Sequence, residues 1–239
     1  MNRMFTRYRP IPLALTTLIA LFSALVALAV SGGHDAAAHE SDEQHAIVDS
    51  NAAQSGPLVT QKELALRNDM RRLWEDHVTW TRLAIISLTT DAPDTEATVG
   101  RLLRNQTDIG DAIKPFYGEA AGEELTRLLR DHILIAAEIV AAARAGDEAG
   151  VSEAQARWTA NADQIAAFLA SANERSWKLD EMKAMLREHL RLTTNEALAR
   201  LQGDWAADVA AYDEIHVHAL GMADMLSTGI VKQFPKRFR

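Results

Sequence analysis

The stretch Leu128-Leu129-Arg130-Asp131-His132-Ile133 decides how this chain can fold, because it sets a histidine inside an apolar run with helical spacing. Leu125, Leu128 and Ile139 recur one or two helical turns from His132, on the same side of the expected helix. A stripe of this kind faces the core of a helical protein. The sequence therefore predicts a helix that points an imidazole inward.

The same pattern occurs twice more in the chain. Leu73-Trp74-Glu75-Asp76-His77-Val78 lies 55 residues earlier and Met185-Leu186-Arg187-Glu188-His189-Leu190 lies 57 residues later. The turn signals Gly146-Asp147 and Gly203-Asp204 are also 57 residues apart. We interpret the three stretches as diverged copies of one αα-hairpin, each of which presents a central histidine to the interior.

Helix signals divide the rest of the chain consistently with this interpretation. Thr60 and Glu63 fit a capping box, and Lys114-Pro115-Phe116-Tyr117-Gly118 is expected to end the first hairpin after Ile113. No stretch alternates like a strand, so the predicted class is all-α, an antiparallel bundle preceded by an N-terminal signal or anchor helix. The expected helices span residues 60–89, 95–113, 119–145, 148–170, 179–202 and 205–231.

The N-terminus has the pattern of a targeting signal. Arg3, Arg7 and Arg9 precede an almost wholly apolar run at 11–30. Such a run is typical of a signal peptide, and it is also long enough to anchor the protein in a membrane if it is not cleaved. Either alternative predicts an extracytoplasmic protein, periplasmic or secreted, with no membrane contact beyond this segment.

Composition defines the remaining organisation. We expect a disordered linker at 31–59 and one helical domain at 60–239. The linker holds His34, His39 and His45, for which a solvated segment is a simpler interpretation than a loose metal site. The chain has no cysteine, which excludes disulfides, and its net charge of −8 argues against nucleic acid as a partner.

Residues at equal distances from a turn lie at the same height in an antiparallel hairpin. This rule places His189 opposite His218, and Met185 opposite Met222. It likewise pairs each of the other two central histidines with an asparagine. The sequence therefore predicts a polar layer at mid-height, made of His77, His132, His189, His218, Asn105 and Asn161.

Three interpretations of this layer remain open. The imidazoles could ligate a transition metal, namely copper, zinc or iron, with Asn105 and Asn161 orienting them and Met185 and Met222 favouring copper. The layer could instead hold a small polar ligand with the help of Tyr212. It could also be a buried hydrogen-bond network that fixes the register of the helices in a structural or interaction module.

Other polar residues give weaker expectations. Asp76, Asp131 and Glu188, which precede the three histidines, are expected to orient the imidazole of a neighbouring helix. Arg82 is expected to pair with an acid such as Glu138 or Asp163. The chain has no P-loop, nucleophile elbow or His-Glu-x-x-His motif, so an enzyme is not favoured, and a metal-dependent oxidoreductase ranks third among the functions.

Several segments resemble an uncharacterised family of bacterial exported or secreted helical proteins. They are the stretches Leu73–Arg82, Lys114–Gly118, Trp158–Asp163 and Gly229–Pro235, and the resemblance covers about residues 70–238. The family has no established activity. Some members carry transferred labels, glycosyltransferase or acetylglutamate kinase, which imply nucleotide-binding α/β folds that this helical pattern does not support. The resemblance implies export and a helical bundle, and we expect a binding protein.

Overall fold

A computed structural model describes residues 59–239 of the chain. The predicted signal or anchor at 1–30 and all but the last residue of the predicted linker lie outside these described residues. None of the helices between residues 59 and 239 combines the length and the apolar character that a membrane span needs.

The described part of the chain is entirely helical, which confirms the all-α prediction. It contains six α-helices, one terminal 3-10 helix and no strand. These elements are α2 (Gln61–Thr90), α3 (Thr95–Tyr117), α4 (Glu119–Ala145), α5 (Glu148–Ala172), α6 (Leu179–Gln202), α7 (Trp205–Gln233) and η1 (Pro235–Phe238).

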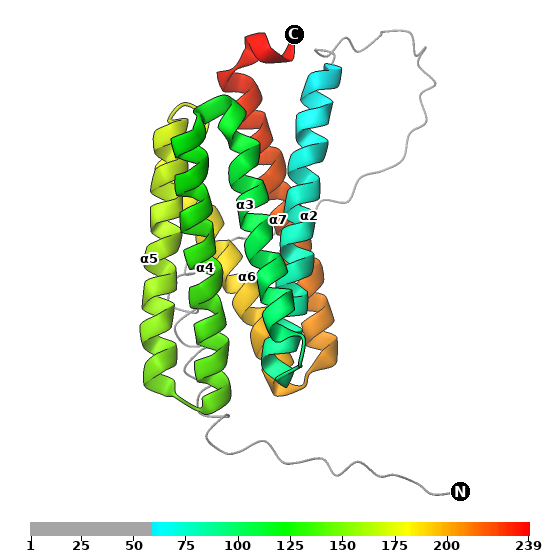
Figure 1. The fold of residues 1–239 in the computed structure, drawn as a ribbon, viewed down its shortest axis with the longest axis vertical. Helices are drawn as coiled ribbons and strands as arrows, with labels where there is room; N and C mark the ends of the chain where they lie inside the picture. The colour runs from blue at the N-terminus through cyan, green and yellow to red at the C-terminus, as the bar shows by residue number, and fades with distance from the viewer. Residues whose placement is uncertain (1–58) are drawn as a thin grey trace, which may run out of the picture.

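The six helices run side by side along the long axis of the molecule and form a bundle (Figure 1). Each helix packs against the next one in the chain, and α7 returns to pack against α2, so the packing closes on itself. Contacts also join α2 to α4 and to α6. The helices α2, α4 and α6, which carry the three sequence-related histidines, therefore meet in the interior.

Local sequence signals explain where most of the helices begin and end. The Thr60 hydroxyl accepts from the Glu63 amide and the Glu63 carboxylate reaches back to the Thr60 amide, as a capping box requires. Gly146 and Gly203 both end their helices in the left-handed region at φ 73°. The aspartate after each glycine then caps the following helix through its side chain.

One predicted boundary is wrong. The helix α3 does not stop at Ile113 but continues through Pro115 to Tyr117, and Gly118 then breaks it at φ 88°. Proline lacks a backbone donor, so one hydrogen bond is missing from the last turn of α3. The turn is still closed by the Gly118 amide, three residues after Pro115, which bonds to the Lys114 carbonyl.

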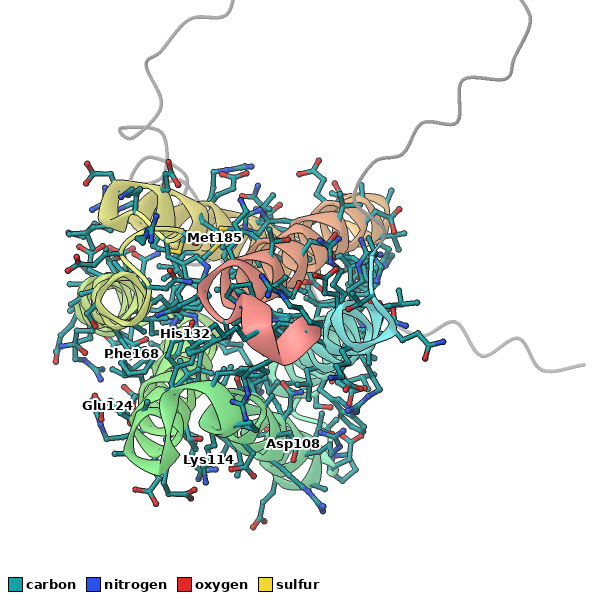
Figure 2. The ribbon with its side chains drawn as sticks, turned by 90° about the horizontal axis from the view of Figure 1, so that it is seen from above. Asp108, Lys114, Glu124, His132, Phe168 and Met185 are labelled. Atoms are coloured by element: carbon teal, nitrogen blue, oxygen red, sulfur yellow. The ribbon has the colours of Figure 1, made fainter. Side chains whose placement is uncertain are left out.

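The core is one large apolar cluster with two smaller ones beside it. The large cluster includes Met70, Trp74, Leu129 and Met222, and draws side chains from all six helices. The smaller clusters are Ala84, Leu102 and Ile133, and Ile85, Val140 and Ala197. The view along the bundle shows His132 inside the helices and Glu124 on the outside (Figure 2).

Candidate functional site, a buried histidine cluster

The predicted histidines come together in the interior of the bundle. His77 from α2, His132 from α4 and His189 from α6 are each at most 5 % exposed. The ring of His189 is central, since its centroid lies 5.7 Å from that of His77 and 6.1 Å from that of His132. The half-buried His218 of α7 is 6.2 Å away on the same measure. We call these four side chains the histidine cluster.

A repeated hydrogen bond holds the layer together. The Asn105 side chain donates to the Leu73 carbonyl over 3.0 Å, and Asn161 donates to the Leu128 carbonyl over the same distance. In the third pair of helices His218 takes the corresponding role, because its Nε2 donates to the Met185 carbonyl over 3.2 Å. In all three cases the acceptor is the carbonyl of the residue four positions before a central histidine.

Hydrogen-bond partners assign the tautomer of one ring. His132 Nδ1 lies 2.8 Å from Asn161 Oδ1, and because that oxygen only accepts, Nδ1 carries the proton. His77 Nδ1 lies 3.3 Å from Gln106 Nε2, but the two hydrogens of that amide have nearer acceptors in the Leu102 carbonyl and Asn105 Oδ1, so this contact assigns no tautomer to His77. The assignment for His132 follows from its partner rather than from observed hydrogens.

The third central histidine differs from the other two. His189 Nδ1 is buried and has no hydrogen-bond partner within residues 59–239. His218 stands where the other pairs have asparagine, and its Nε2 is already bonded to the Met185 carbonyl. An unpaired nitrogen in such a place costs about 1–3 kcal/mol, so His189 is the strained position of the cluster.

Burial keeps the cluster uncharged at neutral pH. Desolvation lowers the pKa of His77 to about 4, helped by the neighbouring His132, and desolvation alone lowers the pKa of His132 to about 4 against the bond from Asn161. Burial and the three neighbouring imidazoles depress the pKa of His189 well below its ordinary value. Burial lowers the pKa of His218 as well. Neutral imidazole is the form that binds metal ions.

The rings as they stand are too far apart to share one ion. Among residues 59–239, no group of three or more His, Asp or Glu side chains is placed to hold a metal. Metal–nitrogen bonds of 2.0–2.1 Å would put the centroids of two ligand rings about 5 Å apart. The observed separations of 5.7–6.2 Å exceed that spacing.

Other predicted residues lie near the cluster or away from it. Met185 and Met222 both line an apolar cavity of about 40 Å³ that also touches Trp74, whose ring is 5.5 Å from that of His77. Tyr212 is placed elsewhere, with its hydroxyl 3.5 Å from that of Thr79 and its ring beneath the guanidinium of Arg82.

The expectation for the acids that precede the histidines is wrong for Asp76 and Asp131. Asp76 pairs with Arg101, Asp131 with Arg127, and Glu188 with Arg191, all at least partly exposed. Each acid lies about a quarter turn from its histidine, where an arginine on the outer surface is the nearer partner. Glu188 still acts on His218 of the neighbouring helix, because its charge raises the pKa of that imidazole against the effect of burial.

The expected partners of Arg82 are also wrong. Arg82 bonds to Glu196 over 2.9 Å and to Asp208 over 3.0 Å, and Arg200 bonds to the same Asp208 over 3.1 Å. Burial raises the pKa of Glu196 to about 7 despite the bond from Arg82. The two acids expected for Arg82 pair with other cations, Glu138 with Arg157, and Asp163 with Lys183 and Arg187.

The sequence reasoning missed several polar residues of the interior, of which Gln106 and Asp208 bear on the histidine cluster and on the ion pairs of Arg82. Gln106 is fully buried, and its amide nitrogen lies within hydrogen-bond distance of Leu102, Asn105 and His77. Asp208 is 2 % exposed and lies in the first turn of α7. The neighbour relation of Gln106 to Asn105 was a usable signal, whereas nothing local marks Asp208.

No family model, no curated protein and no solved structure matches this chain.

Proposed function

We propose that this protein is an extracytoplasmic binding protein whose histidine cluster takes up one transition-metal ion. The observation that carries the proposal is the buried Nδ1 of His189, which has no partner within the described residues and is surrounded by three other imidazoles. A bound ion would give this nitrogen the partner that the protein does not supply. His77, His132, His189 and His218 are the proposed ligands.

The chemistry of the four rings supports uptake of an ion. All are neutral near pH 7, so binding displaces few protons. His132 carries its proton on Nδ1 and His218 on Nε2, which leaves one nitrogen of each ring with a free lone pair. Rings would have to approach His189 by about 1 Å to reach the spacing of a metal site.

Asn105 and Asn161 are the proposed orienting residues. Each amide is anchored to a backbone carbonyl, and Asn161 also accepts from His132, so the ring of His132 is held at a fixed angle. Met185 and Met222 line the apolar cavity that also touches Trp74. Their soft thioether groups are the proposed reason for a preference for copper over zinc or iron.

We also propose that the three αα-hairpins arose by repetition of one unit. Three side chains make corresponding bonds near the three central histidines, and the Gly146 and Gly203 turns have the same φ of 73°. These likenesses support three diverged αα-hairpins. The extracytoplasmic location rests on the arginines and the apolar run at the N-terminus, and is tested by whether the chain is exported.

Metal binding can be measured on the full chain. His34, His39 and His45 are first replaced by alanine, so that the N-terminal histidines contribute nothing. The protein is stripped with a chelator, incubated with Cu²⁺, Zn²⁺ or Fe²⁺ in turn, desalted and analysed for bound metal. We expect about one ion per chain, bound most tightly for copper.

The matched variants are His189→Ala and His216→Ala. The second removes an imidazole that bonds to Glu75 at the surface between α7 and α2, outside the cluster. We expect His189→Ala to lose the ion and His216→Ala to keep it, with unchanged helical circular dichroism in both. Absence of bound metal in the parent chain, or equal retention by both variants, would refute the proposal.

The second candidate is a structural or interaction module without a ligand. The observation that favours it is the same set of amide-to-carbonyl bonds, which fixes the register of α2 with α3 and of α4 with α5. In this case the melting temperature of the full chain would be the same with metal and with chelator. Metal binding predicts a higher melting temperature for the loaded protein.

A further inference from the structure

A second cavity lies between the two small apolar clusters. It has a volume of about 60 Å³ and is lined by residues of α2, α3, α4, α5 and α6. Every buried member of both clusters borders it: Ala84, Leu102 and Ile133 of one, and Ile85, Val140 and Ala197 of the other. The core is thus interrupted here, and a guest of the right size would connect the two clusters.

Small side chains create this space. Ala84 of α2, Ala136 and Ala137 of α4 and Ala197 of α6 all line the cavity, at positions where larger apolar residues would close it. An apolar cavity with few polar partners stays dry, because a buried water needs two to four hydrogen bonds. An apolar guest would fill the cavity and make van der Waals contacts with its lining, which the empty cavity lacks.

The lining determines the chemical class of the guest. Among residues 59–239, no charged side chain borders the cavity, which argues against ions and zwitterions as guests. An apolar cavity of about 150 Å³ holds benzene, so this smaller one fits a molecule of about two or three heavy atoms. The polar groups on the side chains of its described lining are the Trp158 indole, which donates to the His132 carbonyl, and three threonine hydroxyls.

Among the three threonine hydroxyls, that of Thr81 is fully buried and available to a guest. Thr193 already donates to the His189 carbonyl over 2.9 Å. Thr81 Oγ1 is buried and makes no hydrogen bond within residues 59–239. A hydroxyl without a partner in an apolar wall gains a hydrogen bond if the guest carries an oxygen.

We propose that this cavity binds a small uncharged molecule that has an apolar body and one hydroxyl or carbonyl oxygen, with Thr81 as the hydrogen-bonding residue. The site is distinct from the histidine cluster, since none of the four histidines lines it. It requires no metal, and its failure would leave the proposed metal site untouched.

Ethanol is a suitable probe, and ethane is the matched probe without an oxygen. The full chain, kept in chelator, is labelled at its isoleucine methyl groups and titrated by NMR. We expect saturable shifts at Ile85 and Ile133, which line the cavity, and none at Ile215, which is buried at 3 % exposure but lines neither cavity described above. Binding should be in the millimolar range for so small a molecule.

Three variants test the assigned contacts, and a fourth serves as a control. Thr81→Val keeps the shape of the side chain and removes the hydroxyl, so it should weaken ethanol binding by about tenfold and leave ethane binding unchanged. Thr81→Ser restores the hydroxyl and should restore ethanol binding. Ala197→Leu should abolish binding of both probes, whereas Ala141→Leu, an exposed position of α4, should affect neither.

The proposal is overturned by any of three results. These are an absence of saturable shifts in the parent chain, equal affinity of the parent and Thr81→Val for ethanol, and binding that survives Ala197→Leu. Because Thr81→Val is nearly the same size as the original residue, a loss of folding does not stand in for a loss of binding, and the methyl spectrum reports both.

Discussion

The pair α4/α5 and the pair α6/α7 solve the same problem in different ways. In α4/α5 the Asn161 amide donates to the Leu128 carbonyl and accepts from His132, so every polar group of the contact is used. In α6/α7 His218 donates to the Met185 carbonyl, and His189 Nδ1 is left without a partner in the described chain. One residue type at one position separates the two arrangements.

This difference locates one position where the bundle gives up stability. An amide has both a donor and an acceptor, whereas a neutral imidazole has one of each on opposite sides of its ring. His218 therefore cannot donate to the carbonyl and bond to His189 as Asn161 does with His132. The bundle loses about 1–3 kcal/mol at this position, and a bound partner of His189 would recover that free energy.

Acid should produce the largest effect, because it protonates the buried central histidines that the helix pairs carry. The pKa of His77 and of His132 is about 4 in the folded metal-free protein and 6.5 in the unfolded chain. Their contribution to stability is therefore complete above pH 6.5 and is lost as the pH falls towards 4. The loss is roughly 3 kcal/mol for each histidine, measured as the free energy of urea unfolding between pH 7 and pH 4.

Glu196 acts in the opposite direction and must be removed from this measurement. Its pKa of about 7 in the folded protein exceeds the ordinary 4.5, so its contribution is complete below pH 4.5 and is lost as the pH rises through 7. The Glu196→Gln background holds this group neutral throughout. A free energy that stays constant from pH 7 to pH 5 in that background would contradict neutral burial of the histidines.

The next largest effect should come from truncating the residues opposite the histidines. The loss of stability should differ between the two helix pairs. Asn161→Ala leaves His132 Nδ1 unpaired in a buried place and removes the second hydrogen bond of the Leu128 carbonyl, and should cost about 2 kcal/mol of unfolding free energy. His218→Ala should cost about 1 kcal/mol, because His189 has no bond to lose and the site is half-exposed. Urea unfolding at pH 7 in chelator compares them, and equal costs would show that the two pairs do not differ as described.

The sequence predicted the relations that local geometry controls. The Gly146-Asp147 turn sets the register of α4 and α5, so counting from it placed His132 opposite Asn161, where the structure has a 2.8 Å hydrogen bond. The same counting placed His189 level with His218, whose rings are 6.2 Å apart. The periodic apolar stripes likewise gave the helices, to within a few residues at their ends.

The sequence did not predict the contacts between helices that are distant in the chain. The partners of Arg82 depend on the closure of the bundle by α7 against α2, which brings Asp208 within 3.0 Å, and no local pattern encodes that closure. Asp131, the acid before His132, was misassigned for a simpler reason, since Arg127 stands one turn away on the same helix. Whether four rings share an ion depends on displacements of about 1 Å, far below what residue spacing can define.

The smallest expected effect is also the sharpest test of the comparison. His218→Asn should convert α6/α7 to the arrangement of α4/α5, with the new amide donating to the Met185 carbonyl and accepting from His189 Nδ1. The Met185 carbonyl and His189 Nδ1 would then both be hydrogen-bonded, whereas only the carbonyl is now. The metal-free protein should therefore gain about 1 kcal/mol of unfolding free energy and melt a few degrees higher. The same variant should lose the metal ion, because it removes one proposed ligand and occupies the free nitrogen of another.

The reciprocal substitution Asn161→His completes this argument. It should impose the unpaired arrangement on His132 and cost about 1–2 kcal/mol in chelator. If His189 was left unpaired so that an ion could bind, stability and metal affinity must change in opposite directions in His218→Asn. If both fall together, the histidine at 218 is needed for the fold itself, and the unpaired nitrogen of His189 is a cost of packing rather than the mark of a site.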